Sequence, residues 1–136
     1  MTSEPEKDGV VAVLSDGSGR HLYIRRGLTI ARAPGYWCFV GGEVEAGESI
    51  EAAIVREVFE EVGLEIRALE KIHESVSPNG EFRLHWMRVE LTRPGQEVRP
   101  HEKEVADSRW LTMEEALKLE PILSGLKAWL TKQLKQ

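Results

Sequence analysis

The sequence predicts an α/β fold, namely an α/β/α sandwich in which helices cover a mixed β-sheet. Strand-like runs of β-branched and alternating apolar residues flank one amphipathic helical segment near the middle of the chain, and further helical patterns close it. A length of 136 residues suits one packed core, and no repeat or linker marks a second domain. We therefore expect a single domain over residues 1–136, with residues 1–8 as a flexible N-terminal tail.

The composition, 41% hydrophobic and 30% charged, is typical of a soluble globular protein. A net charge of -5 argues against broad contact with nucleic acid or anionic membranes, so we expect neither as a partner. No apolar run is long enough to span a bilayer, and residues 1–9 lack the apolar core of a signal peptide. The single cysteine, Cys38, excludes an intrachain disulfide and is expected to be a buried structural thiol. We expect a cytoplasmic protein.

The chain is expected to begin with a β-hairpin. Residues 10–14 form a β-branched run, residues 15–19 are a Ser-Asp-Gly-Ser-Gly turn cluster, and residues 21–25 resemble a second strand. An Ala-Pro-Gly sequence at 33–35 then breaks the chain before a short apolar run at 37–40.

A helix is predicted over residues 50–62. Ser49 is suited to cap its first turn, and Gly63 suits the left-handed position that follows its last turn. Its glutamates lie on or beside the faces away from the apolar stripe, so the helix has one side for the core and another for chemistry. The apolar stripe consists of Ile50, Ala53, Ile54, Val58 and Val62.

After this helix the pattern returns to strands. Residues 64–77 alternate well enough for one or two strands, and a Pro-Asn-Gly turn follows at 78–80. Residues 81–91 predict a long strand whose alternation changes phase near Met87, which we interpret as a bulge. Residues 93–107 form a polar loop.

The C-terminal part predicts a short strand and two helices. The strand covers residues 108–111, and a helix follows over 113–119, where Thr112 and Glu115 have the spacing of a capping box. A last amphipathic helix is expected to start near Pro121. Its buried stripe consists of Ile122, Leu123, Leu126, Trp129 and Leu130.

The most specific feature is the acidic segment at residues 42–64, GEVEAGESIEAAIVREVFEEVGL. Glu57 and Glu61 are four residues apart and Glu60 follows Glu57 by three, so a helix places all three toward one side. Glu48 lies just upstream, where a loop leads into the helix. Clustered carboxylates repel one another, and a hard cation bound by oxygen ligands is the usual reason for tolerating them.

The register of this segment resembles the signature of the Nudix hydrolase family. That signature is Gly, five residues, Glu, seven residues, Arg-Glu, an aliphatic residue, any residue, Glu-Glu, any residue, Gly and an aliphatic residue. A solvated acidic helix with a glycine cap, the ordinary interpretation of a charge run, does not explain Gly42, Glu48 and Arg56 together. The chain fills every fixed position: Gly42, Glu48, Arg56, Glu57, Val58, Glu60, Glu61, Gly63 and Leu64.

The resemblance implies the Nudix-type α/β/α fold and hydrolysis of nucleoside diphosphates linked to another group, with Mg²⁺ or Mn²⁺ as cofactor. It implies Glu57 and Glu61 as the metal ligands, with Glu60 completing the cluster directly or through water. The carbonyl of Gly41 and the carboxylate of Glu48 are further candidate ligands, and Glu48 has the alternative role of bracing the loop. Bound metal neutralises pyrophosphate charge and lowers the pKa of a bound water. The identity of the general base stays open, with Glu57 as one candidate.

Two further catalytic roles follow from the resemblance. Arg56 is expected to orient a catalytic glutamate through charge-assisted hydrogen bonds. Several family members use another glutamate from a distant loop, and Glu104, shortly before Trp110, is the first candidate here, with Glu102 as the alternative. Solvated loop residues are the ordinary interpretation of both. The neighbouring His101 could act as a base, although a lone exposed histidine is more often inert.

For the substrate, Arg25 and Arg32 are candidate phosphate contacts, and Trp37 and Phe82 are candidates for stacking on a base. Solvation is the commoner role of single arginines, and core packing is the commoner role of aromatic residues in strands. Further residues of the same kinds are Arg26, Tyr36 and Trp86.

We therefore predict a metal-dependent hydrolase that cleaves a pyrophosphate bond in a nucleoside diphosphate derivative, which is a nucleoside triphosphate, an ADP-ribose-like molecule or a dinucleoside polyphosphate. The short chain resembles the MutT-like group, and its partner is a small-molecule nucleotide. The alternative is a nucleotide-sensing or regulatory protein without turnover, although such proteins usually lose the glutamates retained here. The base, sugar and leaving group, the number of metal ions and the choice between monomer and homodimer stay open.

Overall fold

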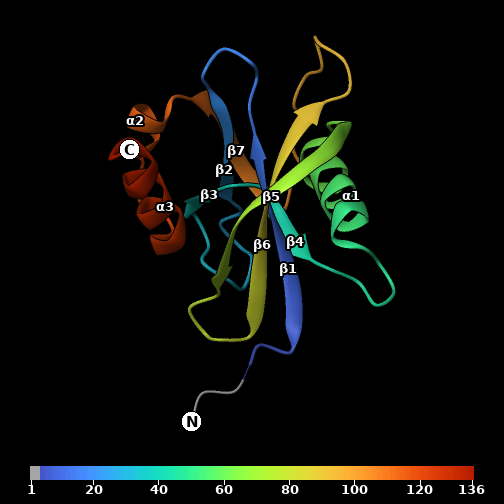
Figure 1. Cartoon of the computed structure of the whole chain (residues 1–136). Coiled ribbons are helices and arrows are strands. Elements are labelled where there is room, and N and C mark those ends of the chain that lie inside the picture. Colours follow the sequence, from blue (N-terminus) through green and yellow to red (C-terminus); the bar gives the residue numbers. More distant parts are fainter. Residues whose placement is uncertain (1–3) are drawn as a thin grey trace.

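The structure, a computed structural model, describes residues 4–136 and places two β-sheets between helices (Figure 1). Helix α1 (Ile50–Val62) lies on one side of the sheets, and helices α2 (Met113–Ala116) and α3 (Ser124–Leu134) lie on the other. The predicted α/β/α arrangement is thus confirmed. None of the helices over residues 4–136 is long and apolar enough to cross a membrane.

The first sheet carries the functional helix. Its order is β4 (Gly41–Glu43), β1 (Lys7–Leu14), β6 (Phe82–Leu91) and β5 (Ile66–Val76). Strands β1 and β6 are parallel, whereas the other two pairs are antiparallel, so the sheet is mixed as predicted. The apolar stripe of α1 packs on one face of this sheet and forms one hydrophobic core with it.

The second sheet has the order β3 (Trp37–Cys38), β2 (His21–Arg26) and β7 (Val105–Leu111), with antiparallel neighbours. A second core, rich in aromatic rings, joins both sheets to the C-terminal helices. The Phe39 ring stacks on Tyr23 with 4.9 Å between the ring centroids. It contacts Trp86 and Trp129 edge to face. The rings in this core are Tyr23, Trp37, Phe39, Trp86 and Trp129.

The predicted hairpin at the start of the chain is wrong. Strands β1 and β2 follow one another but belong to different sheets, and their ladder is reduced to one bridge between Ser15 and His21. The physical reason is competition for edges, because β4 and β6 occupy the two edges of β1. At the turn over residues 15–19 the chain therefore passes from the first sheet to the second instead of forming a hairpin within one sheet.

The predicted tail over residues 1–8 is too long. Lys7 and Asp8 already belong to β1 and pair with Phe82 and Arg83 of β6. Residues 1–3 lie outside the described residues.

Helix α1 has the predicted bounds and both predicted caps. The Ser49 hydroxyl accepts a hydrogen bond from the Ala52 backbone N–H (3.0 Å). Gly63 adopts the left-handed conformation (φ 68°), and its N–H donates to the Phe59 carbonyl. This agreement fixes which helix face carries which glutamate.

The irregularity predicted near Met87 lies on the opposite strand. Residues 64–77 contain one strand, β5, whose register against β6 shifts between Ala68 and Lys71 and again before His73. Strand β6 itself pairs with β1 without interruption. Its change of phase arises because both faces are buried: Trp86 packs among the aromatic rings, whereas Met87 packs toward α1.

The C-terminal elements are confirmed in order, with different lengths. Strand β7 starts at Val105, earlier than predicted, because it pairs with β2 along its length. Helix α2 has the predicted capping box between Thr112 and Glu115 but ends at Ala116. Helix α3 starts at Ser124 rather than near Pro121.

Candidate active site

Gly41 and Gly42 of β4 allow helix α1 and strand β1 to pack closely against this edge strand of the first sheet. Gly42 of β4 lies directly under the Glu57 side chain, and a Cβ atom on Gly42 would come within 2.2 Å of the carboxylate carbon. A Cβ on Gly41 would come within 2.3 Å of the Val10 carbonyl oxygen in β1. Gly42 thus provides space for a carboxylate, and Gly41 provides space for the sheet.

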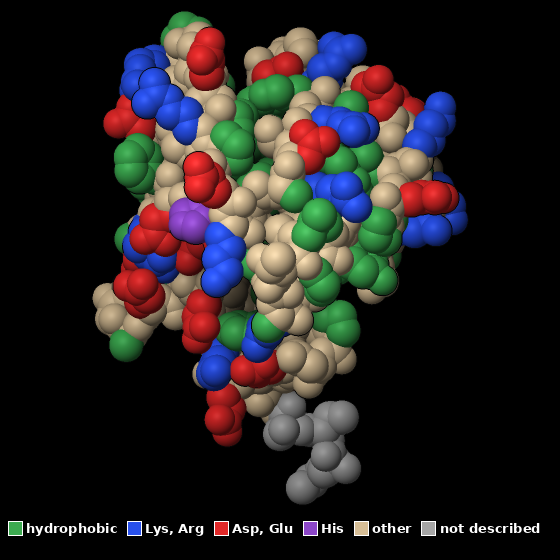
Figure 2. Space-filling view, turned by 180° about the vertical axis from the view of Figure 1, so that it is seen from behind, with side chains coloured by type: hydrophobic (Ala, Val, Ile, Leu, Met, Phe, Trp, Pro, Cys, Tyr) green, Lys and Arg blue, Asp and Glu red, His purple; other side chains and the backbone are tan. Residues whose placement is uncertain are grey.

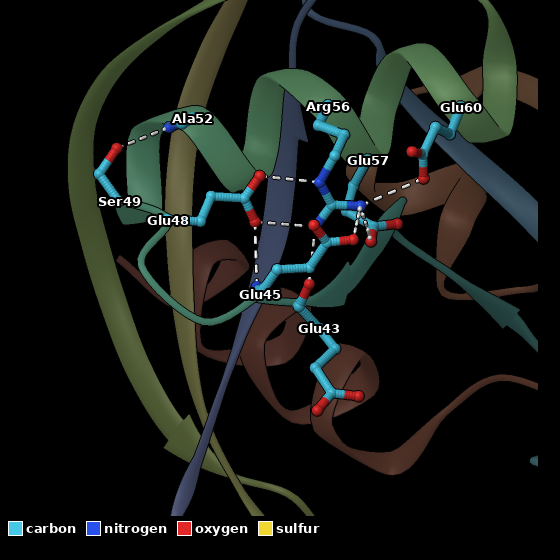
Figure 3. Close-up of polar contacts among 8 residues, drawn as sticks. All are labelled: Glu43, Glu45, Glu48, Ser49, Ala52, Arg56, Glu57 and Glu60. Atoms are coloured by element: carbon cyan, nitrogen blue, oxygen red, sulfur yellow. Dashed lines mark hydrogen bonds and ion pairs between the residues drawn. The ribbon is translucent and has the colours of Figure 1, made fainter.

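Arg56 gathers the glutamates on one side of α1, as Figure 3 shows. Its Nε and Nη2 atoms donate to the two oxygens of Glu48, at 2.8 and 2.9 Å, in a bidentate pair. The Nη2 atom also donates to the Glu43 carbonyl (2.9 Å). The Nη1 atom donates to Glu57 Oε1 (2.8 Å) and to Glu60 Oε2 (3.1 Å). One arginine therefore ties the loop before α1 to the helix.

Glu48 is fully engaged by these contacts. Besides the two bonds from Arg56, its Oε1 atom accepts a bond from the Glu45 backbone N–H (3.0 Å). The Arg56 hydrogen bonds hold the pKa of Glu48 at about 2, well below its usual range. This geometry favours the bracing role of Glu48 over the alternative role of metal ligand.

The two half-buried glutamates of α1 are in the opposite electrostatic situation. Burial raises the pKa of Glu57, and Arg56 offsets part of that rise. Burial also raises the pKa of Glu61, to about 8, and the negative charges of Glu57 and Glu104 act in the same direction. Arg26 is the basic residue that opposes this shift. Burial and the like charges around Glu61 therefore outweigh the groups that lower its pKa.

A cavity of about 740 Å³ opens beside Glu61. Its acidic end is lined by Gly41, Glu61 and Glu104, and its far end by side chains of β5, β6 and the start of α3. Arg26 lines the same cavity. In the view from behind, Figure 2 shows a hollow in the molecule bordered by acidic and basic side chains.

The structure brings two of the four predicted substrate residues to this cavity. Arg32 and Phe82 both line it, and the Arg32 guanidinium lies 5.0 Å from the centre of the Phe82 ring. Arg32 also forms an ion pair with Glu81, with 2.7 Å between Arg32 Nη2 and Glu81 Oε2. The face of Phe82 is thus already occupied by a cation.

The other two candidate substrate residues, Arg25 and Trp37, do not line this cavity. The Arg25 Nε atom donates to the Gly35 carbonyl (3.0 Å), away from the residues that line the cavity. Trp37 is only 4% exposed and lies in the aromatic core, with the Arg109 guanidinium 4.9 Å from its ring. The strand alternation of β2 places Arg26, rather than Arg25, at the cavity.

The distal loop reaches the acidic end as predicted. Glu104 lines the cavity and acts on the pKa of Glu61, whereas Glu102 does not line it. His101 does not line the cavity. Its ring instead accepts hydrogen bonds from backbone N–H groups of the same loop. Cys38 is buried, and burial raises the pKa of its thiol to about 11, which fits a structural thiol.

The donor set fits a divalent cation with oxygen ligands. Glu57, Glu61 and Glu104 carry repelling carboxylates near the backbone of Gly41, which is the chemistry that Mg²⁺ or Mn²⁺ requires. Over residues 4–136, no three His, Cys, Asp or Glu side chains already stand close enough to enclose an ion. Mg²⁺ usually keeps several waters and takes its remaining ligands from substrate phosphates.

In this two-sheet α/β/α fold, Glu61 of helix α1 lines a cavity of about 740 Å³ beside the acidic residues of the helix. The model of the NUDIX domain matches residues 5–132, so the chain belongs to the Nudix family. This confirms the resemblance found in the acidic segment.

Individual relatives agree with this assignment. The chain is 37% identical over 81 residues to the NAD-capped RNA hydrolase NudC of Pseudomonas aeruginosa. The aligned region covers 60% of this chain and 28% of that protein. It is 33% identical over 110 residues to the isopentenyl-diphosphate Delta-isomerase of Klebsiella pneumoniae, which covers 76% of this chain and 60% of that protein. The crystal structure of a MutT protein from Methanosarcina mazei Go1 superposes over 100% of both chains, with a TM-score of 0.79 and 19% identity. That likeness concerns the fold.

Proposed function

We propose that this protein is a Mg²⁺- or Mn²⁺-dependent hydrolase that cleaves a pyrophosphate bond in a nucleoside diphosphate derivative. The observation that carries the proposal is a pair of half-buried carboxylates with raised pKa values: Glu61, which lines a large cavity, and Glu57, whose carboxylate lies over Gly42 of the cavity wall and acts on the pKa of Glu61. At about 740 Å³, the cavity has the size of small-molecule sites, which span roughly 300–1,000 Å³.

The residues of the acidic end divide the work. Glu57 and Glu61 would hold the metal, with Glu60 at the exposed side and the Gly41 carbonyl as a further oxygen donor. Arg56 keeps one oxygen of Glu57 in place and leaves the other for a ligand. When bound, the metal supplies charge neutralisation at the pyrophosphate and lowers the pKa of water. The attacking water must also lose a proton, and Glu57 and Glu104 are the candidate acceptors.

The far end of the cavity supports a nucleotide as substrate. Arg32 at this end and Arg26 beside Glu61 provide cations for phosphate oxygens, and the apolar side chains of Val76, Leu84 and Leu126 provide a wall for a base. Nucleoside triphosphates, ADP-ribose-like molecules and dinucleoside polyphosphates all fit this description. Because one relative is named for NAD-capped RNA, a nucleotide at the end of an RNA chain belongs in the test, and the exclusion of nucleic acid stays a prediction.

A substrate panel with Mg²⁺ tests the proposal. We expect phosphate, pyrophosphate or a nucleoside monophosphate to be released from at least one nucleotide of the panel, and a chelator should abolish the release. Tight binding of a nucleotide without turnover would instead support the alternative of a sensing protein.

The isomerase relatives define a second outcome to measure. Isopentenyl diphosphate should be included in the panel, because a relative of that name matches 76% of this chain. Rearrangement of its double bond, with the diphosphate left intact, would contradict the proposed hydrolysis.

A further inference from the structure

The loop at residues 99–104, which we call the Glu104 loop, is attached to the metal-binding helix itself. The backbone N–H groups of Arg99 and His101 donate to the carbonyls of Val62 (2.7 Å) and Glu61 (2.8 Å). These carbonyls belong to the last turn of α1, whose carbonyls lack partners within the helix. The loop and the helix turn that carries Glu61 are thus one hydrogen-bonded unit.

His101 organises the turn that leads to Glu104. Its Nδ1 atom accepts hydrogen bonds from the backbone N–H groups of Lys103 and Glu104, both at 3.3 Å. Its carbonyl accepts a bond from the Val105 N–H (3.0 Å). A side-chain acceptor that receives the N–H groups two and three residues later acts as the cap of a short turn.

Gly27, at the end of β2, holds the same turn from the other side. Its N–H donates to the Glu104 carbonyl (2.9 Å). A Cβ atom on Gly27 would lie 1.9 Å from the Lys103 carbonyl oxygen, so any side chain here displaces the loop. Glycine is thus required at position 27 because two backbone segments approach closely there, and not because the backbone adopts a left-handed conformation.

These contacts act on a carboxylate that electrostatics pushes away. Glu104 and Glu61 line the same cavity and repel one another, so a loosely attached loop would let the exposed Glu104 side chain move away from Glu61. We propose that Gly27 and His101 are positioning residues that clamp the Glu104 loop and hold the Glu104 carboxylate opposite Glu61. The consequence for turnover rests on the proposed function, whereas the clamp itself does not.

Amide hydrogen exchange tests the clamp without any substrate. Replacing His101 with alanine removes the acceptor, and we expect exchange of the Lys103 and Glu104 amides to accelerate by about tenfold, the value of one hydrogen bond. His101→Asn should restore slow exchange, because asparagine caps turns through its side-chain oxygen. Lys103→Ala is the matched control in the same turn, since it keeps every backbone contact. Unchanged exchange in His101→Ala would overturn the proposal, whatever the enzyme does.

Steady-state kinetics then test whether the clamp acts through Glu104. With a substrate found in the panel, His101→Ala should lower kcat by about tenfold with little change in KM, and His101→Asn should recover most of it. In a Glu104→Gln background the His101→Ala change should cause no further loss, because both act on one group. Losses that multiply would contradict action through Glu104.

Gly27→Ala provides a second, independent lever. We expect faster exchange of the Glu104 amide and a loss of kcat similar to that of His101→Ala, with thermal unfolding used to verify that each variant is folded. Normal exchange and normal kcat in a folded Gly27→Ala variant would overturn the role of Gly27. Absence of turnover by the unaltered protein on every substrate would refute the proposed function, and the exchange measurements would still decide the clamp.

Discussion

The two ends of the acidic helix side differ in how their charge is balanced. At one end, Arg56 binds Glu48 through two hydrogen bonds and reaches Glu60, so the carboxylates are neutralised by a cation of the chain itself. At the other end, Glu61 and Glu104 line one cavity, and the pKa of Glu61 is raised because burial and repulsion outweigh the opposing charge of Arg26. We call these the neutralised end and the open end.

This difference separates structural from functional use of the same residue type. A neutralised carboxylate needs no ligand and stabilises the loop that precedes α1, whereas an open carboxylate is costly until a cation arrives. Glu57 lies between the ends, with one oxygen bound by Arg56. The comparison predicts that equal substitutions at the two ends have unequal effects on turnover and stability.

The largest effect is expected from Glu61→Gln. Loss of this carboxylate removes a proposed metal ligand, and we expect kcat to fall by about 10²–10⁴-fold with the fold intact. Glu60→Gln is the matched control, because Glu60 is the adjacent residue but is 56% exposed and contacts Arg56 at the neutralised end. Its loss should be tenfold at most on the same scale. Equal losses, measured with one substrate at saturating Mg²⁺, would break the distinction between the ends.

Gly42→Ala should have the next largest effect. The added Cβ would press on the Glu57 carboxylate and displace it, and a shift of about 1 Å near the chemistry can cost about 10²-fold in rate. Gly41→Ala provides the contrast, because its Cβ would press on the Val10 carbonyl of the sheet. We expect reduced turnover with modest destabilisation for Gly42→Ala and clear destabilisation for Gly41→Ala, measured by kinetics and thermal unfolding. The reverse pattern would show that Gly42 serves the sheet.

Arg56→Lys probes the neutralised end and is expected to act mainly on stability. Lysine cannot reproduce the bidentate pair with Glu48 or the bond to the Glu43 carbonyl. Because both side chains are mostly buried (22% and 15% exposed), we expect a loss of about 1–3 kcal/mol in the free energy of unfolding. Turnover should fall by roughly 10–100-fold through the misplaced Glu57. Denaturant titration and kcat on the same variant separate the two effects, and unchanged stability would remove the bracing role.

The sequence predicted what depends on local pattern and failed where partners compete. The bounds and caps of α1 follow from Ser49 and Gly63, which act within one helical turn, and the structure confirms both. The assignment of β1 and β2 to different sheets follows from edges occupied by strands far along the chain, so adjacency in sequence gave the wrong hairpin. Nonlocal pairing of this kind leaves no signal in neighbouring residues.

The candidate site shows the same limit. The glutamates of α1 were identified from their spacing, since a helix fixes their relative directions. Arg25 and Trp37 were chosen by residue type, and the facing of β2 and the burial of β3 exclude both from the cavity. The period of two in β2 could have identified Arg26 once the facing of one neighbour was known. The clamp at Gly27 had no local signal, because it depends on the approach of residue 103.

The smallest effect concerns pH and stability at the open end. Without metal, the pKa of Glu61 rises from about 4.5 in the unfolded chain to about 8 in the folded protein. A raised folded-state pKa means that the contribution of neutral Glu61 is fully present below about pH 4.5 and is lost as the pH rises toward 8. We therefore expect the metal-free Tm to fall between pH 6 and 8, by an amount on the order of 5 °C.

Mg²⁺ should reverse this loss, because it binds the ionised carboxylate and stabilises only the folded protein. The rise in Tm on adding Mg²⁺ is thus expected to be larger at pH 8 than at pH 6. Glu61→Gln should remove both the Glu61 part of the pH dependence and most of the Mg²⁺ effect, whereas Glu60→Gln, at the neutralised end, should retain both. If the Tm of Glu61→Gln depended on pH and Mg²⁺ as the Tm of the unaltered protein does, the pKa of Glu61 would lie in its ordinary range. The open end would then be balanced by the chain itself, as the neutralised end is.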